Sequence, residues 1–360
     1  MVEHTKKSEI LDLLPSNKKQ LDHIILHFLP KTHDSPEILK LYEMMRDYPS
    51  RGGKGLRGTM CLMCCELFGG KRSSAMITAS ALELFQNWIL IHDDIEDKSD
   101  LRRGFPALHK KVGIELAINA GDALHGKMWE LLLQNQPVLG SDLSIRILAE
   151  FAQMLNATTE GQQMELAWTM GHNWDIREED YFLMVTKKAA WYTCISPTKL
   201  GILLASHERG KHGIRTDRNL MSRVIEFGTH VGISFQIIDD VLNLVGEESK
   251  YGKEILGDLF EGKRTLMLIH LLNHADSFEK QKIIEILSKP RQKKSLGEVR
   301  FVFERMLDLG SIDYAKQVAK RLSDVALSEF DEIASKQGVG HGASFKRTRS
   351  LFEYLTLRDY

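Results

Sequence analysis

The sequence predicts an all-α protein, a bundle of ten or more helices. Apolar residues recur at helical spacing through most of the chain, and the dipeptides that form hairpin turns are nearly absent. Eight prolines and no long Gly/Ser-rich tract leave no obvious linker in 360 residues. We therefore expect residues 1–360 to form a single domain.

The helical spacing can be followed in order along the chain. In "LDHIILHFLP" the apolar residues form one stripe, which Pro30 closes. Similar stripes run through residues 76–92, 114–133, 143–157, 178–206, 219–245, 263–274, 298–309 and 312–336. We expect a solvated basic surface loop at 288–295 and another loop at 336–352.

The composition excludes several classes of protein. Forty-eight basic and 49 acidic residues leave a net charge of −1, so no overall field favours nucleic acid or an anionic membrane. No apolar run reaches the roughly 18–20 residues of a membrane span, and the N-terminus lacks the apolar core of a signal peptide. The cytoplasm is the expected compartment. Cys61 and Cys64 form a CxxC pattern inside a helix expected to be buried, which favours core packing over a metal site.

The stretch "ILIHDDIEDKSDLRRG" ends an apolar run in a crowd of carboxylates. Asp93 and Asp97 are four residues apart and share a helix face, with Asp94 beside them, and Arg102 and Arg103 follow. Crowded carboxylates are costly to ionise unless a positive charge lies among them. A solvated acidic turn is the alternative interpretation of this cluster alone.

A second stretch, "FQIIDDVLNLVGEESKYGKEILGDLFEGKRT", repeats the pattern. Asp239 and Asp240 end an apolar run, Asn243 follows at helical spacing, and Lys253 and Lys263 lie downstream. The repetition argues against the solvated turn, and neither cluster has the spacing of an EF-hand or of a di-iron bundle. Two such helix ends facing each other across a cavity would suit Mg²⁺, which takes one or two carboxylates together with substrate phosphates. The sequence therefore predicts a magnesium diphosphate site.

These motifs resemble the trans-isoprenyl diphosphate synthases, a family that includes farnesyl and geranylgeranyl diphosphate synthases. The matching stretches occur in the family's order and cover about residues 45–275: "GGKGLRG", "DDIEDKSDLRRGFPALH", "GDALHGKMWELL", "KKAAWYTCISPTKLG", "FQIIDD" and "YGKEILGDLFEGKRT". The resemblance implies an all-α homodimer in which both acidic motifs face a central cavity.

The resemblance also implies roles for individual residues. Several Mg²⁺ ions per site would be held by Asp93, Asp94, Asp97, Asp239 and Asp240. The allylic diphosphate (dimethylallyl, geranyl or farnesyl) would be contacted by Arg102, Lys188, Lys253 and Lys263. Gln236, also a candidate substrate-binding residue, lies beside the second cluster and would help to orient that cluster. Isopentenyl diphosphate would be bound by Lys54, Arg57, Gln86 and Arg103. Catalysis would rest on the five aspartates and Lys188.

The implied reaction is the condensation of isopentenyl diphosphate with an allylic diphosphate, which needs no protein nucleophile. Two departures from the family pattern stand out: Asn243 replaces a frequent third Asp but keeps an oxygen ligand, and Ala189 replaces a frequent Thr. Two other functions stay open, a class I terpene cyclase and a non-catalytic subunit of a heteromeric synthase. The cyclase would not need the second diphosphate site, and the subunit would be expected to lack part of one cluster.

Product length depends on the apolar helix before the first cluster. Trp88 precedes Asp93 by five residues, about 7.5 Å of helix rise, and Phe85 precedes it by eight, about 12 Å. With Ile89, these residues are the candidate floor of a tunnel for the growing chain. In the family that the sequence resembles, an aromatic residue at the position of Trp88 goes with short products. The resemblance therefore implies geranylgeranyl diphosphate (C20), with farnesyl (C15) and geranylfarnesyl (C25) diphosphate as alternatives. Trp88 could equally be an ordinary core residue.

Overall fold

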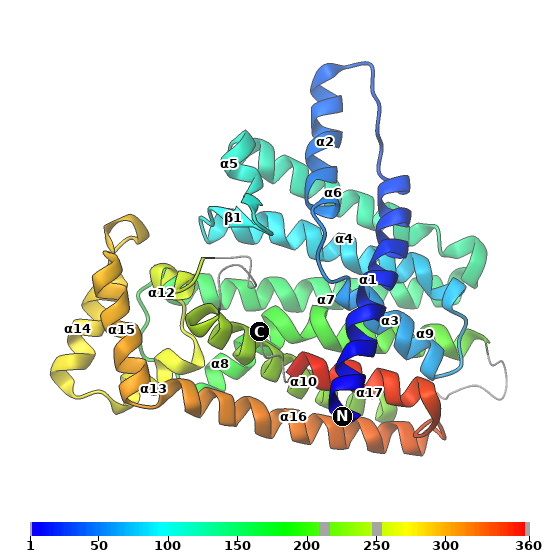
Figure 1. Ribbon diagram of the computed structural model, residues 1–360. Helices are drawn as coiled ribbons and strands as arrows, with labels where there is room; N and C mark the ends of the chain where they lie inside the picture. The colour runs from blue at the N-terminus through cyan, green and yellow to red at the C-terminus, as the bar shows by residue number, and fades with distance from the viewer. Residues whose placement is uncertain (1, 209–216, 247–253, 357–360) are drawn as a thin grey trace.

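The structure, a computed structural model, describes residues 2–208, 217–246 and 254–356. These residues are almost entirely helical (Figure 1). In chain order the elements are α1 (Val2–Phe28), α2 (Pro36–Ser50), α3 (Leu56–Leu67), α4 (Arg72–Glu96), β1 (Leu101–Arg102), β2 (Phe105–Pro106), α5 (Leu108–Val112), α6 (Ile114–Leu133), α7 (Gln136–Met170), α8 (Glu178–Val185), the π-helix η1 (Thr186–Ile195), α9 (Ser196–Glu208), α10 (Arg218–Val245), α12 (Gly257–Glu261), α13 (Leu266–His274), α14 (Ser277–Ser288), the 3₁₀ turn η3 (Arg291–Lys293), α15 (Leu296–Asp308), α16 (Ser311–Lys336) and α17 (Gly342–Thr356). The all-α prediction is confirmed.

The helices pack against one another through their apolar faces. Helix α4 lies between α3 and α6, while α10 packs against α16 on one side and η1 on the other. Figure 1 shows α16 running along one edge of the molecule beneath α10, with α17 turning back beside it. Among the helices of the described ranges, none is long and apolar enough to cross a bilayer.

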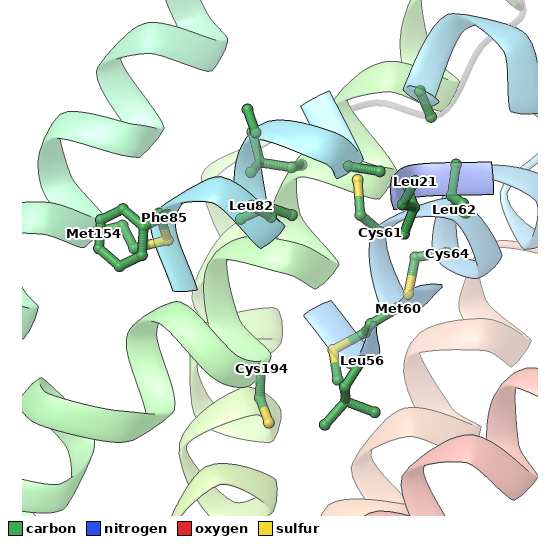
Figure 2. Packing of buried hydrophobic residues seen from close by; sticks show 14 of the residues in the cluster. Leu21, Leu56, Met60, Cys61, Leu62, Cys64, Leu82, Phe85, Met154 and Cys194 are labelled. Atoms are coloured by element: carbon green, nitrogen blue, oxygen red, sulfur yellow. The ribbon is translucent and has the colours of Figure 1, made fainter. Parts of the chain in front are cut away.

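The core supports the interpretation of the CxxC pattern. Cys61 and Cys64 of α3 are fully buried, and Figure 2 shows them among Leu21, Met60 and Leu82. Burial raises the pKa of the Cys61 thiol well above its usual value, as expected for a residue that packs rather than binds metal.

The prediction of a loop at 336–352 is wrong, because most of this segment belongs to α17. The basic run "KRTRS" hides the helical pattern, since the helix buries only one narrow face. Phe352 on that face is buried and packs edge-on against Phe227 of α10, with ring centroids 4.7 Å apart. One buried face is enough to hold an otherwise charged helix.

The solvated loop predicted at 288–295 is also partly wrong. It contains η3, but the side chain of Lys294 is buried and its Nζ donates to the carbonyl oxygens of Leu259 at 3.2 Å and Phe260 at 2.6 Å. This lysine therefore satisfies the carbonyls at the end of α12.

Candidate active site

The first acidic cluster lies in the last turn of α4, which buries its apolar residues against α3 and α6. Asp94 is fully buried; Arg102 Nε donates to its Oδ1 at 2.9 Å, and the Tyr48 hydroxyl of α2 donates to its Oδ2 at 2.5 Å. A buried carboxylate needs such partners, because an unpaired charge away from water is very costly. In this structure Asp94 therefore faces Arg102 and Tyr48.

Arg102 is delivered by a tight hairpin that follows the cluster. Strands β1 and β2 pair Leu101 with Pro106 and Arg102 with Phe105. Arg103 and Gly104 form the turn at φ +55° and +76°, the left-handed pattern of a type I′ hairpin. The turn directs the side chains of the two neighbouring arginines toward different partners. Arg102 reaches the aspartates, whereas Arg103 Nη1 donates to the carbonyl oxygen of Tyr48 at 2.8 Å.

Asp93 and Asp97 are paired with lysines from distant parts of the chain. Lys188 Nζ of η1 lies 3.6 Å from Asp93 Oδ1 and also contacts Glu165 of α7. Lys263, downstream of the second cluster, donates to Asp97 Oδ2 at 2.7 Å. Burial raises the pKa of Asp97 to about 7, although Lys263 opposes the shift. The two motifs therefore lie side by side in space.

The second cluster lies near the end of α10. Asp240 is buried and accepts hydrogen bonds from Gln236 Nε2 at 2.7 Å and from the Tyr181 hydroxyl of α8 at 2.9 Å. Burial, with Asp258 adding to it, raises the pKa of Asp240 well above its usual value. Asn243 is buried too, and its Oδ1 accepts the backbone N–H of Asp258 at 3.0 Å. The side-chain oxygen expected to be a ligand is therefore already used to hold the start of α12.

One cavity of about 380 Å³ joins the two clusters. The predicted site residues that line it are Arg57, Gln86, Trp88, Ile89, Asp93, Arg102, Lys188, Gln236, Asp239, Asp240 and Lys263. The expectation that both acidic helix ends face one cavity is met by Asp93 from α4 and Asp239 from α10.

Other predicted residues lie behind or outside this cavity. Asp94, Asp97, Arg103 and Phe85 are not among the residues that line it, and Phe85 is fully buried behind Trp88. Lys54 lies apart, in a separate hollow between α1 and α17 whose lining includes residues 18, 22 and 354. The expectation for Lys253 lies outside the described residues.

The cavity lining also includes residues that the sequence analysis did not assign to the site, among them Glu165, Tyr181 and Asp258. Each contacts a predicted residue through side chains that are distant in sequence, such as Tyr181 on Asp240. Helical spacing alone gave no signal for them, because single polar residues are common on apolar helix faces that belong to no site.

The positive charges of the site neutralise its carboxylates in this state. Arg102 forms ion pairs with Asp93 and Asp94, Lys188 with Asp93, and Lys263 with Asp97. Burial lowers the pKa of Lys188, but the nearby carboxylates of Glu165 and Asp93 outweigh this effect and hold the pKa above its usual value. The cavity therefore contains cationic side chains that can exchange a carboxylate partner for an incoming anion.

A profile of the polyprenyl synthetase family matches residues 39–306. The chain belongs to the polyprenyl synthetase family. It is a short-chain trans-prenyl diphosphate synthase, a prenyltransferase, as the sequence motifs predicted. Family members condense isopentenyl diphosphate with an allylic diphosphate.

Relatives of known identity cover nearly the whole chain. The geranylgeranyl diphosphate synthase of Sulfolobus acidocaldarius is 33% identical over 310 residues, which are 86% of this chain and 89% of the relative. The geranylfarnesyl diphosphate synthase of Natronomonas pharaonis is 29% identical over 314 residues, covering 83% and 86%. The crystal structure of geranylgeranyl pyrophosphate synthetase from Pyrococcus horikoshii superimposes with a TM-score of 0.82 at 28% identity, covering 98% of this chain and all of the other.

Proposed function

We propose that this polyprenyl synthetase makes geranylgeranyl diphosphate (C20) from isopentenyl diphosphate and an allylic diphosphate. The observation that carries the proposal is the single cavity with Asp93 and Asp239 on opposing helices and Trp88 deeper along α4. A diphosphate would occupy the charged mouth, and its hydrocarbon chain would extend toward Trp88.

The chemistry of the donor set fits Mg²⁺. Among the described residues no three metal-ligating side chains converge into a finished site. Mg²⁺ keeps some of its water and takes substrate phosphate oxygens in addition to one or two carboxylates. Asp93 and Asp239, supported by Asp94, Asp97 and Asp240, would hold it, and when bound it would supply positive charge to the leaving diphosphate.

Four side chains are suited to bind the allylic diphosphate. Arg102, Lys188 and Lys263 already line the cavity as cations, and each would exchange part of its carboxylate contact for phosphate oxygens. Gln236 lies beside them, with its Nε2 on Asp240, and would fix the orientation of that carboxylate. These groups stabilise the charge that develops as the allylic C–O bond breaks.

Arg57 and Gln86 are suited to the second substrate. The Arg57 guanidinium lies over the ring of Tyr192, 4.4 Å from its centroid, and donates to Thr193 Oγ1 at 2.8 Å. Arg57 Nε and Gln86 Oε1 are buried without a hydrogen-bond partner among the described residues. Buried polar atoms of this kind call for a ligand or water. Lys54 and Arg103 are the other two residues proposed for isopentenyl diphosphate, and the Arg103 guanidinium lies against the backbone of Gly53, next to Lys54.

Carbon–carbon bond formation then requires positioning rather than a protein nucleophile. The allylic carbocation left by the departing diphosphate is attacked by the double bond of isopentenyl diphosphate. A proton is lost from the resulting cation to the released diphosphate, which the cavity's cations retain. The protein's part is to hold both reactants close and to exclude water.

Trp88 is suited to limit product length. Its ring lines the cavity, stacks on His125 of α6 with centroids 4.1 Å apart, and meets Phe85 edge-on at 5.3 Å. Aromatic contacts on two sides fix the orientation of the ring at the cavity wall.

Replacing Trp88 with Ala is expected to shift the product from C20 toward C25 and longer chains, because removing the indole opens the space beyond it. Chromatography of dephosphorylated products measures the shift. Phe151→Leu is the control, since Phe151 is a buried aromatic residue of α7 that does not line the cavity, and it should change the distribution much less. An unchanged distribution in Trp88→Ala would remove this residue as the floor.

The proposed activity is tested by a product assay with labelled isopentenyl diphosphate, Mg²⁺ and each of the C5, C10 and C15 starters. We expect turnover by the purified chain alone and a C20 product. Hydrocarbon released from an allylic diphosphate without isopentenyl diphosphate would indicate a cyclase instead. Failure to turn over alone would indicate a subunit that needs a catalytic partner.

We further propose that the protein acts as a homodimer. Helices α6 and α7 present an apolar groove formed by Trp129, Leu133, Ile145 and Leu148, next to alanines. Leu133 and Ile145 are 60% and 63% exposed and lie together on this groove, and contiguous exposed apolar patches mark protein–protein contacts. A second copy placed on this groove would bury the same face of both chains, as a two-fold interface requires.

Ile145→Glu combined with Leu133→Glu is expected to convert the dimer into a monomer, because each carboxylate would be desolvated in the apolar interface. Sedimentation velocity measures the mass. Val325→Glu, at an exposed position on α16, is the control and should remain dimeric. A wild-type protein that sediments as a monomer would contradict the proposal.

A further inference from the structure

The π-helix η1 is an unusual element that carries three side chains of the site. It interrupts an otherwise continuous helical run between α8 and α9, and its last turn closes with the N–H of Ser196 on the carbonyl of Trp191. Lys188 and Tyr192 line the cavity, while Thr193 holds Arg57. π-Helical turns are rare and occur frequently at functional sites.

Helix α7 passes this segment at a glycine. A Cβ atom on Gly161 would lie 2.1 Å from the backbone N of Lys188, 2.6 Å from its Cα and 2.8 Å from the carbonyl carbon of Lys187. These are main-chain atoms, so no rotamer change relieves the collision. The backbone of Lys188 can lie this close to α7 only because Gly161 has no side chain.

A glycine also marks the opposite side of η1. A Cβ on Gly232 of α10 would lie 2.3 Å from the Cβ of Ala190 and 2.5 Å from its Cα. The π-helix is therefore held between two helices that each approach it at van der Waals contact. A segment fixed from both sides has little freedom to move its side chains along the cavity.

The depth of Lys188 depends on this close approach. Its amine contacts Glu165, which lies one turn beyond Gly161 on α7, and reaches to 3.6 Å from Asp93 on α4. If η1 were pushed away from α7 by the width of a methyl group, the amine would lose its reach to both carboxylates and to any phosphate between them.

We propose that Gly161 is a positioning residue for diphosphate binding, which sets the depth of Lys188 by admitting the π-helix against α7. This inference rests on the proposed role of Lys188 in holding the allylic diphosphate. It adds that a residue without any side chain, and outside the cavity lining, controls that contact.

The test is a double-mutant cycle of Gly161→Ala and Lys188→Ala on the purified protein. Each single variant is expected to lower kcat/KM for the allylic substrate by about 10- to 100-fold, since a displacement of about 1 Å at a reacting group has an effect of that order. In the Lys188→Ala background, Gly161→Ala is expected to change kcat/KM by less than ~3-fold, because its effect passes through the lysine. Losses that multiply in the double variant would overturn the proposal.

Gly228→Ala is the matched control. Its Cβ would lie 3.0 Å from the Cα of Ile195, so it disturbs the same π-helix at its far end, beyond Lys188. It is expected to lower the melting temperature while its effect on kcat/KM stays the same with or without Lys188. Equal coupling to Lys188 from both glycines would show a general packing role and would overturn the proposal.

Failure of the proposed function gives a different result. If the wild-type protein does not condense the two diphosphates, the function fails before any variant is compared. If the wild-type is active and Lys188→Ala keeps full activity, the role of Lys188 fails and the positioning role with it. If Gly161→Ala does not fold, Gly232→Ala, which presses η1 at Ala190, takes its place in the cycle. If neither variant folds, the glycines serve the fold alone and the proposal is wrong.

Discussion

Asp93→Asn is expected to lower kcat by about 10³-fold, the order seen when one preorganised electrostatic contact to a developing charge is removed. Asp93 lines the cavity and lies between two cations, with Arg102 Nη2 at 3.3 Å and Lys188 Nζ at 3.6 Å. The amide keeps the shape and one oxygen but loses the charge that would hold the divalent ion. Steady-state kinetics at saturating Mg²⁺ measure the loss.

The control for this substitution is Asp308→Asn at the end of α15. Its side chain is 60% exposed and pairs with Arg305 on the surface, so activity should be unchanged. An Asp93→Asn enzyme with near wild-type kcat would contradict the assignment of the first cluster. Restoration of activity by Mg²⁺ above the concentration that saturates the wild-type enzyme would instead indicate that only the affinity for the ion had fallen.

Lys263→Met is expected to lower the free energy of unfolding by about 3–5 kcal/mol, because it leaves buried carboxylates without their counter-charge. Lys263 Nζ lies 2.7 Å from Asp97 Oδ2 and 2.9 Å from Glu261 Oε2, and its side chain is only 16% exposed. The same change removes a cation proposed to hold the allylic diphosphate. Activity should fall as well, by about 100-fold, the effect of losing one charge-assisted contact.

Urea unfolding followed by circular dichroism measures this stability, and Lys320→Met is the control. Lys320 also pairs with an aspartate at 2.6 Å, but it is 58% exposed and its pair spans one turn of α16. A surface pair of this kind contributes little, so its loss should fall within about 0.5 kcal/mol. If both lysines proved equally dispensable, the network around Asp97 would not be a stabilising one.

Local patterns predicted the parts of the structure that depend on neighbouring residues. The stripe at 114–133 coincides with α6, and the carboxylates that end two other stripes line one cavity. Both follow from helical periodicity, which a single sequence displays directly.

Contacts between distant residues could not be predicted in this way. No residue near Asp94 in the sequence indicates that the Tyr48 hydroxyl, 46 positions earlier, donates a hydrogen bond to it. Similarly, Lys188 meets Glu165 only because α7 and η1 pack together. The π-helical winding of η1 was not predicted either, since its sequence has the spacing of an ordinary helix, and the close approach of α7 and α10 at Gly161 and Gly232 appears only in the folded structure.

The hairpin after the first cluster carries one arginine from each of the two proposed diphosphate sites. Arg102 and Arg103 are consecutive, yet one faces the aspartates and the other faces the carbonyl of Tyr48 and the glycine loop before α3. Changing the length of this two-residue turn would therefore disturb both of the proposed diphosphate sites at once.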